Sequence, residues 1–241
     1  MSNIKVRELK SLPEQSAGRE IFDITWPVIG GTEITPNLMQ AFVHNGAYFV
    51  GAYDGEKIVG ATFGFIGTAG GIHLHSHMSA VLVDYRDRGI GALMKRHQLT
   101  WAYEHKIPFI TWTFDPLVKR NAKLNILKLG VEVASYHPNF YGVMPDLINA
   151  GDDSDRLMAK WVVGPTSPSE KSLTTTIPDS AITISVPEDI VKLRETNLAE
   201  AKSARVRVRE EFLTAFKDGY KVMGFSDQAG YVLTKGQNED S

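Results

Sequence analysis

The chain has 241 residues, of which 43% are hydrophobic and 22% charged, a composition typical of a globular protein with a substantial core. The formal net charge of −2 gives no electrostatic case for binding nucleic acid or a membrane surface. The absence of cysteine excludes disulfides, thiolate catalysis and cysteine-based zinc sites. The sequence shows neither a secretory h-region nor an apolar run long enough to span a bilayer, so we expect a cytoplasmic protein.

Hydrophobic periodicity predicts a mixed α/β domain in the first two thirds of the chain. The expected elements, in chain order, are a strand over 4–9, helices over 13–24 and 36–44, strands over 47–53, 58–66 and 72–83, a helix over 91–105, a strand over 108–114, a helix over 121–129, and strands over 131–136 and 160–163. The Asp54-Gly55 pair is typical of a hairpin turn between two of these strands.

A segment rich in Pro, Ser and Gly follows Gly164 and predicts a linker over 165–170. The remaining residues, 171–241, are expected to form a small α/β C-terminal extension. Its elements are a strand over 181–186, helices over 187–193 and 199–216, and strands over 220–225 and 231–234. On the longer helix, Arg205, Arg207 and Arg209 are expected to form a solvated face with the neighbouring glutamates.

The most informative segment is Arg86-Asp87-Arg88-Gly89-Ile90-Gly91-Ala92, which lies between a predicted strand and a predicted helix. The first N–H groups of a helix have no partner within it, and the helix dipole favours negative charge there, so this arrangement predicts a phosphate site. Neither a Gly-Lys-Ser/Thr loop nor a Gly-x-Gly-x-x-Gly fingerprint is present. The alternative is an ordinary turn, with glycines for its geometry and arginines for solubility.

This loop resembles the pyrophosphate loop of the GNAT superfamily of acyl-CoA N-acyltransferases. Trp-Thr-Phe-Asp-Pro-Leu at 112–117, Arg-Asn-Ala-Lys-Leu-Asn at 120–125 and a His-Ser-His on the preceding strand are similar to an uncharacterised branch of predicted acetyltransferases within it. The resemblance covers about residues 1–164, which it identifies as a GNAT-like acyl-CoA-binding domain. It implies a mixed central sheet flanked by helices, with acetyl-CoA as co-substrate and no metal.

The resemblance also implies which residues hold the cofactor. Backbone N–H groups of Arg88, Gly89, Gly91 and Ala92 would bind the pyrophosphate, with help from the Arg86 side chain. The backbone of Val81 and Val83, expected on one face of the preceding strand, would pair with the pantetheine amides. Asn121 would contact CoA, although it is equally suited to cap the helix that begins there.

Three histidines, His73, His75 and His77, alternate along one predicted strand and so share a face. Three ligands in a row on one strand rarely converge on one ion, which disfavours a metal site. They can be half-buried polar residues of the strand. The functional hypothesis is a general base, because histidine titrates near neutral pH. We favour His75, which shares its parity with Val81 and Val83, and place His77 second.

The usual general acid of the family is missing. Many members place a tyrosine four residues before the glycine that ends the helix after the fifth strand, and here that position is Ile126. Tyr141 or Tyr136 could substitute, although each is equally suited to be a packing aromatic. Asp115, at the end of a strand, either faces the cleft or caps the residues from Leu117 onward.

The leading hypothesis is an acyl-CoA-dependent N-acyltransferase, most simply an acetyltransferase, in which an amine attacks the thioester directly because no cysteine can carry an acyl group. The alternative is a non-catalytic CoA-binding or ligand-sensing protein that has lost its acid, and a third hypothesis is an interaction protein with a vestigial loop. The acceptor would be a small-molecule or peptide amine. We expect no nucleic-acid or membrane partner, and a homodimer stays open.

Overall fold

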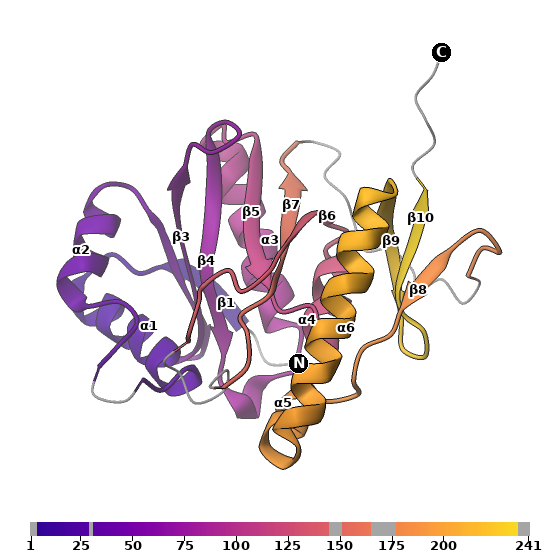
Figure 1. The fold of residues 1–241 in the computed structure, drawn as a ribbon. Helices are drawn as coiled ribbons and strands as arrows, with labels where there is room; N and C mark the ends of the chain where they lie inside the picture. The colour runs from indigo at the N-terminus through magenta and orange to yellow at the C-terminus, as the bar shows by residue number, and fades with distance from the viewer. Residues whose placement is uncertain (1–3, 29–30, 145–150, 165–176, 236–241) are drawn as a thin grey trace. The chain divides into compact units, whose positions relative to one another are not determined.

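The computed structural model describes residues 4–28, 31–144, 151–164 and 177–235 (Figure 1). The chain forms two compact units. Of the described residues, the first unit contains 4–112 and 162–164, and the second contains 113–144, 151–161 and 177–235. The predicted linker over 165–170 lies outside the described residues.

The first unit is built on a mixed sheet. Its strands, in spatial order, are β1 (Ile4–Glu8), β2 (Tyr48–Asp54), β3 (Lys57–Gly67), β4 (His73–Val81) and the first part of β5 (Phe109–Phe114). Strands β1 to β4 pair antiparallel, whereas β4 and β5 pair in parallel. A parallel pair requires a crossover, and α3 (Ile90–Glu104) supplies it.

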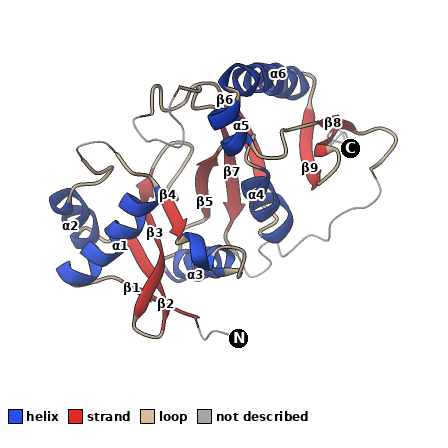
Figure 2. Ribbon diagram, turned by 90° about the horizontal axis from the view of Figure 1, so that it is seen from below, coloured by secondary structure: helices blue, strands red, loops and turns tan. Residues whose placement is uncertain are grey.

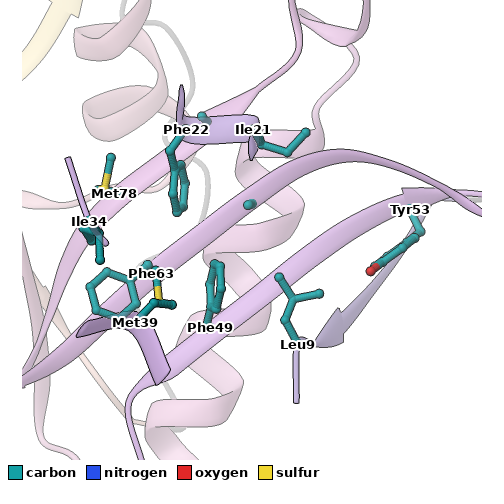
Figure 3. Packing of buried hydrophobic residues seen from close by; sticks show 11 residues of the cluster. Leu9, Ile21, Phe22, Ile34, Met39, Phe49, Tyr53, Phe63 and Met78 are labelled. Atoms are coloured by element: carbon teal, nitrogen blue, oxygen red, sulfur yellow. The ribbon is translucent and has the colours of Figure 1, made fainter. Parts of the chain in front are cut away.

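Helices cover both faces of this sheet (Figure 2). Helix α1 (Leu12–Thr25) starts with a capping box made by Ser11 and Glu14, and α2 (Pro36–His44) starts after the cap Thr35. Residues of α1 and α2 pack on one face, in an aromatic-rich cluster shown in Figure 3 that contains Phe22, Met39, Phe49, Phe63 and Met78. On the other face, Ile90 and Met94 of α3 pack against Ala52 and Val59. The expected mixed sheet flanked by helices is therefore confirmed.

A β-bulge interrupts β4 at His77. Phe63 of β3 is opposite Met78 and Gly64 is opposite Ser76, which leaves His77 as an extra residue. The bulge reverses the alternation of side chains along β4. Ser76, before the bulge, bonds to α3, whereas Met78, after it, packs in the α1/α2 cluster.

The second unit holds the rest of β5 followed by α4 (Lys119–Ala122), the π-helix η2 (Lys123–Lys128), β6 (Glu132–His137) and β7 (Arg156–Val162), with β6 antiparallel to β7. The C-terminal residues add β8 (Ile182–Ile184), α5 (Ile190–Thr196), α6 (Leu198–Lys217), β9 (Tyr220–Ser226) and β10 (Gly230–Lys235). The last strands form a separate antiparallel sheet in the order β8-β10-β9. An α/β C-terminal portion is therefore present, as expected.

Several predicted elements have different bounds in the structure, and two of these differences affect residues of the candidate site. The strand predicted over 72–83 ends at Val81, and residues 83–85 form the 3₁₀ turn η1 (Val83–Tyr85). The helix predicted over 121–129 begins earlier and becomes a π-helix, so Asn121 is not its N-cap. Cap position is held by Val118, which makes no side-chain cap bond.

The prediction that the α6 arginines form a solvated face is also wrong for two of them. Arg205 is 1% exposed and binds both Asp115 and Asp152, while Arg209 binds Asp155. Only Arg207 has the expected surface pairing, with Glu211. The alternation of charges on α6 did not reveal that aspartates that follow β5 and precede β7 face this helix.

Candidate functional site

The loop that joins β4 to α3 has the geometry of an anion site. Asp87 and Gly89 have positive φ angles of 61° and 79°, and Gly89 is the N-cap of α3 without a side-chain cap bond. The first intrahelical bond runs from Leu93 N to Gly89 O. The N–H groups of Ile90, Gly91 and Ala92 therefore precede the helical ladder, at the positive end of the helix dipole.

Both arginines of the loop make contacts with residues at the end of β4 and in the turn that follows it. Arg88 donates a hydrogen bond to the carbonyl oxygen of Asp84 at 2.6 Å, and its guanidinium lies 4.8 Å from the centre of the Tyr85 ring. Arg86 Nε donates to the carbonyl oxygen of Val81 at 3.4 Å. Both cations thus lie beside the helix N-terminus, where they add positive charge to the backbone donors.

The backbone positions expected to meet pantetheine are only partly on a strand. Val81 is the last residue of β4 and packs on the α3 side of the sheet. Val83 lies on the 3₁₀ turn and is 68% exposed. The strand alternation that placed the two valines on one face is therefore wrong, because β4 ends between them.

The parallel ladder between β4 and β5 is short. Among the described residues it comprises Leu74 opposite Ile110 and His75 opposite Thr111. Ser76 to Val81 continue β4 beyond the last of these pairs. The His75 ring bonds across this last pair, with 3.1 Å between its Nδ1 and Thr111 Oγ1.

His75 and His77 lie together beside aromatic rings. Their ring centroids are 6.0 Å apart, and Phe65 lies 5.3 Å from His75 and 5.8 Å from His77. Burial, followed by the charges of His77, His73 and Lys95, lowers the pKa of His75 to about 4. Desolvation by the neighbouring rings also lowers the pKa of His77, although its side chain keeps an exposed edge. At neutral pH both imidazoles are uncharged and can accept a proton.

The parity argument for His75 is wrong. The bulge at His77 lies between His75 and Val81, so the two side chains point to opposite faces of the sheet. His75 faces the side of Phe65, which packs against the α1/α2 cluster, whereas Val81 packs with α3. His73 is buried, stacks on Phe109 and bonds to the carbonyl of Gly71. Its role is therefore structural.

Sequence reasoning missed Lys95, on α3. This lysine is 4% exposed, and its Nζ donates to Ser76 Oγ at 2.7 Å. The available signal was its position in α3, three residues before buried Gln98 and seven before buried Ala102, which places it on the inner side of the helix.

In the second unit, the π-helix places Ile126 in the core at 2% exposure, so this position supplies no acid. Asn121 is half-buried in α4 and its backbone N–H bonds to the Val118 carbonyl. A π-helix exposes an irregular stretch of backbone and is frequent at functional sites.

The two candidate tyrosines of the second unit differ. Tyr141 is 38% exposed, and its hydroxyl lies 2.9 Å from Thr113 Oγ1. Arg156 lies 5.3 Å from the centre of its ring. Tyr136 is buried and donates its proton to Asp155 at 2.6 Å, and burial together with this bond raises its pKa well above the usual range. Tyr136 is therefore committed to the core, whereas Tyr141 is an exposed residue.

Asp115 takes the structural role foreseen as its alternative. Its Oδ1 accepts a hydrogen bond from Leu117 N, and both of its oxygens bind Arg205. Burial alone would raise the pKa of Asp115, but Arg205 and Arg194 hold it below the usual range. The carboxylate is thus fully engaged.

In the part of the chain that the structure describes, no three His, Asp or Glu side chains gather in a way that could hold a metal ion. No helix of those residues has the length and apolar character needed to cross a bilayer.

Comparison with protein-family models finds a match to part of the chain. Residues 16–124 match the acetyltransferase (GNAT) family. This range contains most of α1, all of α2 and α3, β2 to β5, the loop at 86–92 and both candidate histidines. No curated protein sequence matches the chain.

Solved structures share the fold. The chain is similar to an acetyltransferase of the GNAT family from Streptococcus pneumoniae, with a TM-score of 0.54 and 14% identity over 67% of this chain and 100% of that one. It is also similar to Naa50 of Arabidopsis thaliana in complex with the bisubstrate analogue CoA-Ac-MVNAL, with a TM-score of 0.53 and 17% identity over 66% and 98%. The chain is similar as well to the ribosomal-protein-S18-alanine N-acetyltransferase of Escherichia coli, with a TM-score of 0.50 and 12% identity over 70% of this chain and 98% of that one.

Proposed function

Because the chain belongs to the GNAT superfamily of acyltransferases, whose members use acetyl-CoA, we propose that it transfers an acetyl group from acetyl-CoA to an amine. One observation carries the proposal: a strand runs through a loop with two positive φ angles into an uncapped helix N-terminus flanked by two arginines. This arrangement offers backbone donors and positive charge to a pyrophosphate.

The cofactor would be held by residues of this loop. The N–H groups of Arg88, Gly89, Gly91 and Ala92 would bind the pyrophosphate, with Arg86 adding charge. The Val81 backbone would pair with pantetheine, and Val83 would do so from the 3₁₀ turn. Asn121 of the second unit is proposed as a further CoA contact. We propose that residues 1–164, which include the matched range 16–124, form the acyl-CoA-binding domain, and that a linker over 165–170 and a C-terminal extension over 171–241 follow it.

The reaction needs a base and an acid. The acceptor nitrogen would attack the thioester carbonyl carbon, the C–S bond would break, and CoA would leave as a thiolate that takes up a proton. His75 is the proposed base, because its imidazole is neutral at physiological pH and partly exposed, and His77 is the second candidate. Tyr141 is the proposed proton donor, because it is the exposed one of the two candidate tyrosines.

A second candidate function is binding of CoA without turnover. The observation that favours it is Ile126, a buried aliphatic side chain where many relatives place the tyrosine acid. In that case the loop would bind CoA with the same residues, but acetyl transfer would be absent.

The acceptor is proposed to be a small-molecule or peptide amine. The similar structures include one bound to an analogue that carries a peptide. We expect a cytoplasmic protein without nucleic-acid or membrane partners.

The decisive experiment is titration of the full chain with CoA by isothermal calorimetry, followed by release of free thiol from acetyl-CoA in the presence of an amine library. We expect binding and amine-dependent thiol release. Gly91→Asp should abolish binding while leaving the fold stable, since a carboxylate in the first turn suits the helix dipole but repels a pyrophosphate.

Gly91→Ala is the matched control, because it adds a Cβ at the same place without charge and should retain most of the affinity. Absence of CoA binding by the wild-type chain would overturn the proposed function. Binding without thiol release from any amine would favour the non-catalytic alternative.

A further inference from the structure

Lys95 is a buried cation without an acidic partner. Its Nζ donates to Ser76 Oγ at 2.7 Å and to Gln98 Oε1 at 3.3 Å, and lies 3.8 Å from the centre of the Trp112 ring. No carboxylate of the described residues pairs with it. Since a buried charge normally requires an ion pair, a lysine held only by neutral groups calls for an explanation.

The surroundings of Lys95 are also incompletely bonded. The Gln98 side chain is 0% exposed, and its Nε2 has no hydrogen-bond partner in the described part of the chain. Two neutral acceptors and an aromatic face satisfy an ammonium only weakly. Burial without an acidic partner therefore disfavours the charged form of Lys95.

Lys95 is attached to β4 at the point where the strand changes. Ser76 follows the last residue of the parallel ladder, His75, and precedes the bulge residue, His77. A Cβ added to Gly64, opposite Ser76, would lie 2.8 Å from the carbonyl oxygen of His75, so the two backbones approach closely here. A displacement of Ser76 would therefore move the backbone of its two neighbours, His75 and His77.

We propose that Lys95 is a positioning residue of the acetyl-transfer site, which holds β4 through Ser76 and whose charge acts on His75 from the opposite face of the sheet. The proposal deepens the proposed function and rests on it for the role of His75. Lys95 is not itself placed on the substrate.

The charge of Lys95 acts on His75 as one of several contributions, after burial and the charges of His77 and His73. Burial lowers the pKa of Lys95 to about 7, so its charge is lost within the physiological pH range. The charge of Lys95 contributes to the lowered pKa of His75. Above neutral pH, the neutral amine would accept a hydrogen bond from Ser76 and no longer oppose a proton on His75.

Within the first unit, the groups that contact Lys95 do not titrate near neutral pH, so Lys95 is the group that changes charge there. Ser76 on β4, Gln98 on α3 and Trp112 on β5 are neutral throughout this range. The histidines whose charges act with that of Lys95 on His75 are His73 and His77. A titration step near pH 7 in the His75 signal therefore reports Lys95 if it is lost in Lys95→Met.

The test is an NMR titration of the full chain with labelled histidine, in which the His75 signal is assigned by its loss in His75→Asn. In the wild-type chain we expect a main step well below pH 6 and a second inflection near pH 7. In Lys95→Met the inflection near pH 7 should vanish and the main step should move to higher pH. Lys5→Met, which removes an exposed lysine of β1, should change neither feature.

Identical His75 curves in the wild-type chain and Lys95→Met would overturn the proposal. The titration requires neither CoA nor an acceptor, so it is independent of the proposed function. If the inflection is present but CoA does not bind, the link between Lys95 and His75 stands and the acetyl-transfer role fails.

A second readout guards against a variant that is merely misfolded. The folded pKa of Lys95 lies below its unfolded value, so the unfolded chain binds the extra proton between about pH 7 and pH 10 and the fold becomes more stable as pH rises. The urea midpoint of the wild-type chain should increase over this window relative to that of Lys95→Met. Parallel midpoints would count against a titrating Lys95.

Discussion

At the scale of single residues, the site depends on an uncharged histidine. An exposed histidine would be half-protonated near pH 6.5, whereas burial and nearby cations keep His75 neutral down to about pH 4. A base with such a low pKa is unprotonated at physiological pH, but it binds a proton only weakly. The rate should therefore depend strongly on the fraction of the acceptor amine that is already deprotonated.

We predict that His75→Ala lowers turnover by about 10²–10⁴-fold, the usual effect of removing a positioned base, while leaving CoA affinity unchanged. His44→Ala, at an exposed position near the end of α2, serves as the control. Steady-state thiol release and calorimetry measure the two effects. Loss of CoA affinity in His75→Ala would instead make His75 a structural residue.

The pH profile provides a separate prediction about the same residue. Because the folded pKa of His75 is about 4, its free-base fraction is nearly constant from pH 5.5 to 7, and the rate should show no fall at pH 6.5 from this group. Turnover of an acceptor with a low amine pKa, such as an aniline, measures this without interference from the acceptor. A clear loss of rate centred on pH 6.5 that persists in Lys95→Met would exclude His75 as the base.

At the scale of elements, helix α6 shows that an alternation of charges does not determine what faces a helix. Arg205 and Arg207 are both charged and two residues apart, yet they are 1% and 42% exposed. Their energetic roles should differ accordingly.

Arg205→Met should destabilise the second unit by about 3–5 kcal/mol, because the buried carboxylates of Asp115 and Asp152 would lose one of the guanidiniums that balance their charge. Arg207→Met, which removes an exposed pair with Glu211, should change the free energy of unfolding by about 0.3–0.5 kcal/mol. Urea unfolding at pH 7 distinguishes the two. Similar effects for both variants would contradict the buried network.

The elements show what the sequence could and could not predict. Periodicity predicted α2 over its full range, and β2 and β3 to within about a residue, because each of these depends on local spacing and caps. The bulge at His77 and the π-helix over 123–128 depend on strand register and on packing against distant residues, which no local pattern contains. The loop was predicted because its glycines act locally, whereas Lys95 was missed because its burial depends on β4 and β5.

At the scale of the whole molecule, the C-terminal residues are bound to the core of the second unit. Phe212 of α6 stacks on Tyr136 with ring centroids 5.4 Å apart, and the Tyr231 hydroxyl donates to the carbonyl oxygen of Pro116 at 2.7 Å. Within this unit, the C-terminal helices and strands therefore share apolar and polar contacts with earlier residues.

A chain truncated after Gly164 should lose cooperative unfolding and aggregate, because it exposes the apolar surface that α6 covers. A chain that lacks only residues 236–241 is the control and should melt like the full chain. Circular dichroism melts and size-exclusion chromatography report the result. A monomeric truncated chain with an unchanged melting temperature would show instead that residues 171–241 form an independent module.

The buried pairing of Asp115 and Asp152 with Arg194 and Arg205 has an evolutionary consequence. Two carboxylates and two guanidiniums compensate one another, so a mutation at one position leaves an excess charge that a second must cancel. Single substitutions should then be purged, whereas paired losses of opposite sign are tolerated. The residues at the four positions should therefore covary among related sequences. In the same way, Asp152→Asn should restore part of the stability that Arg205→Met loses.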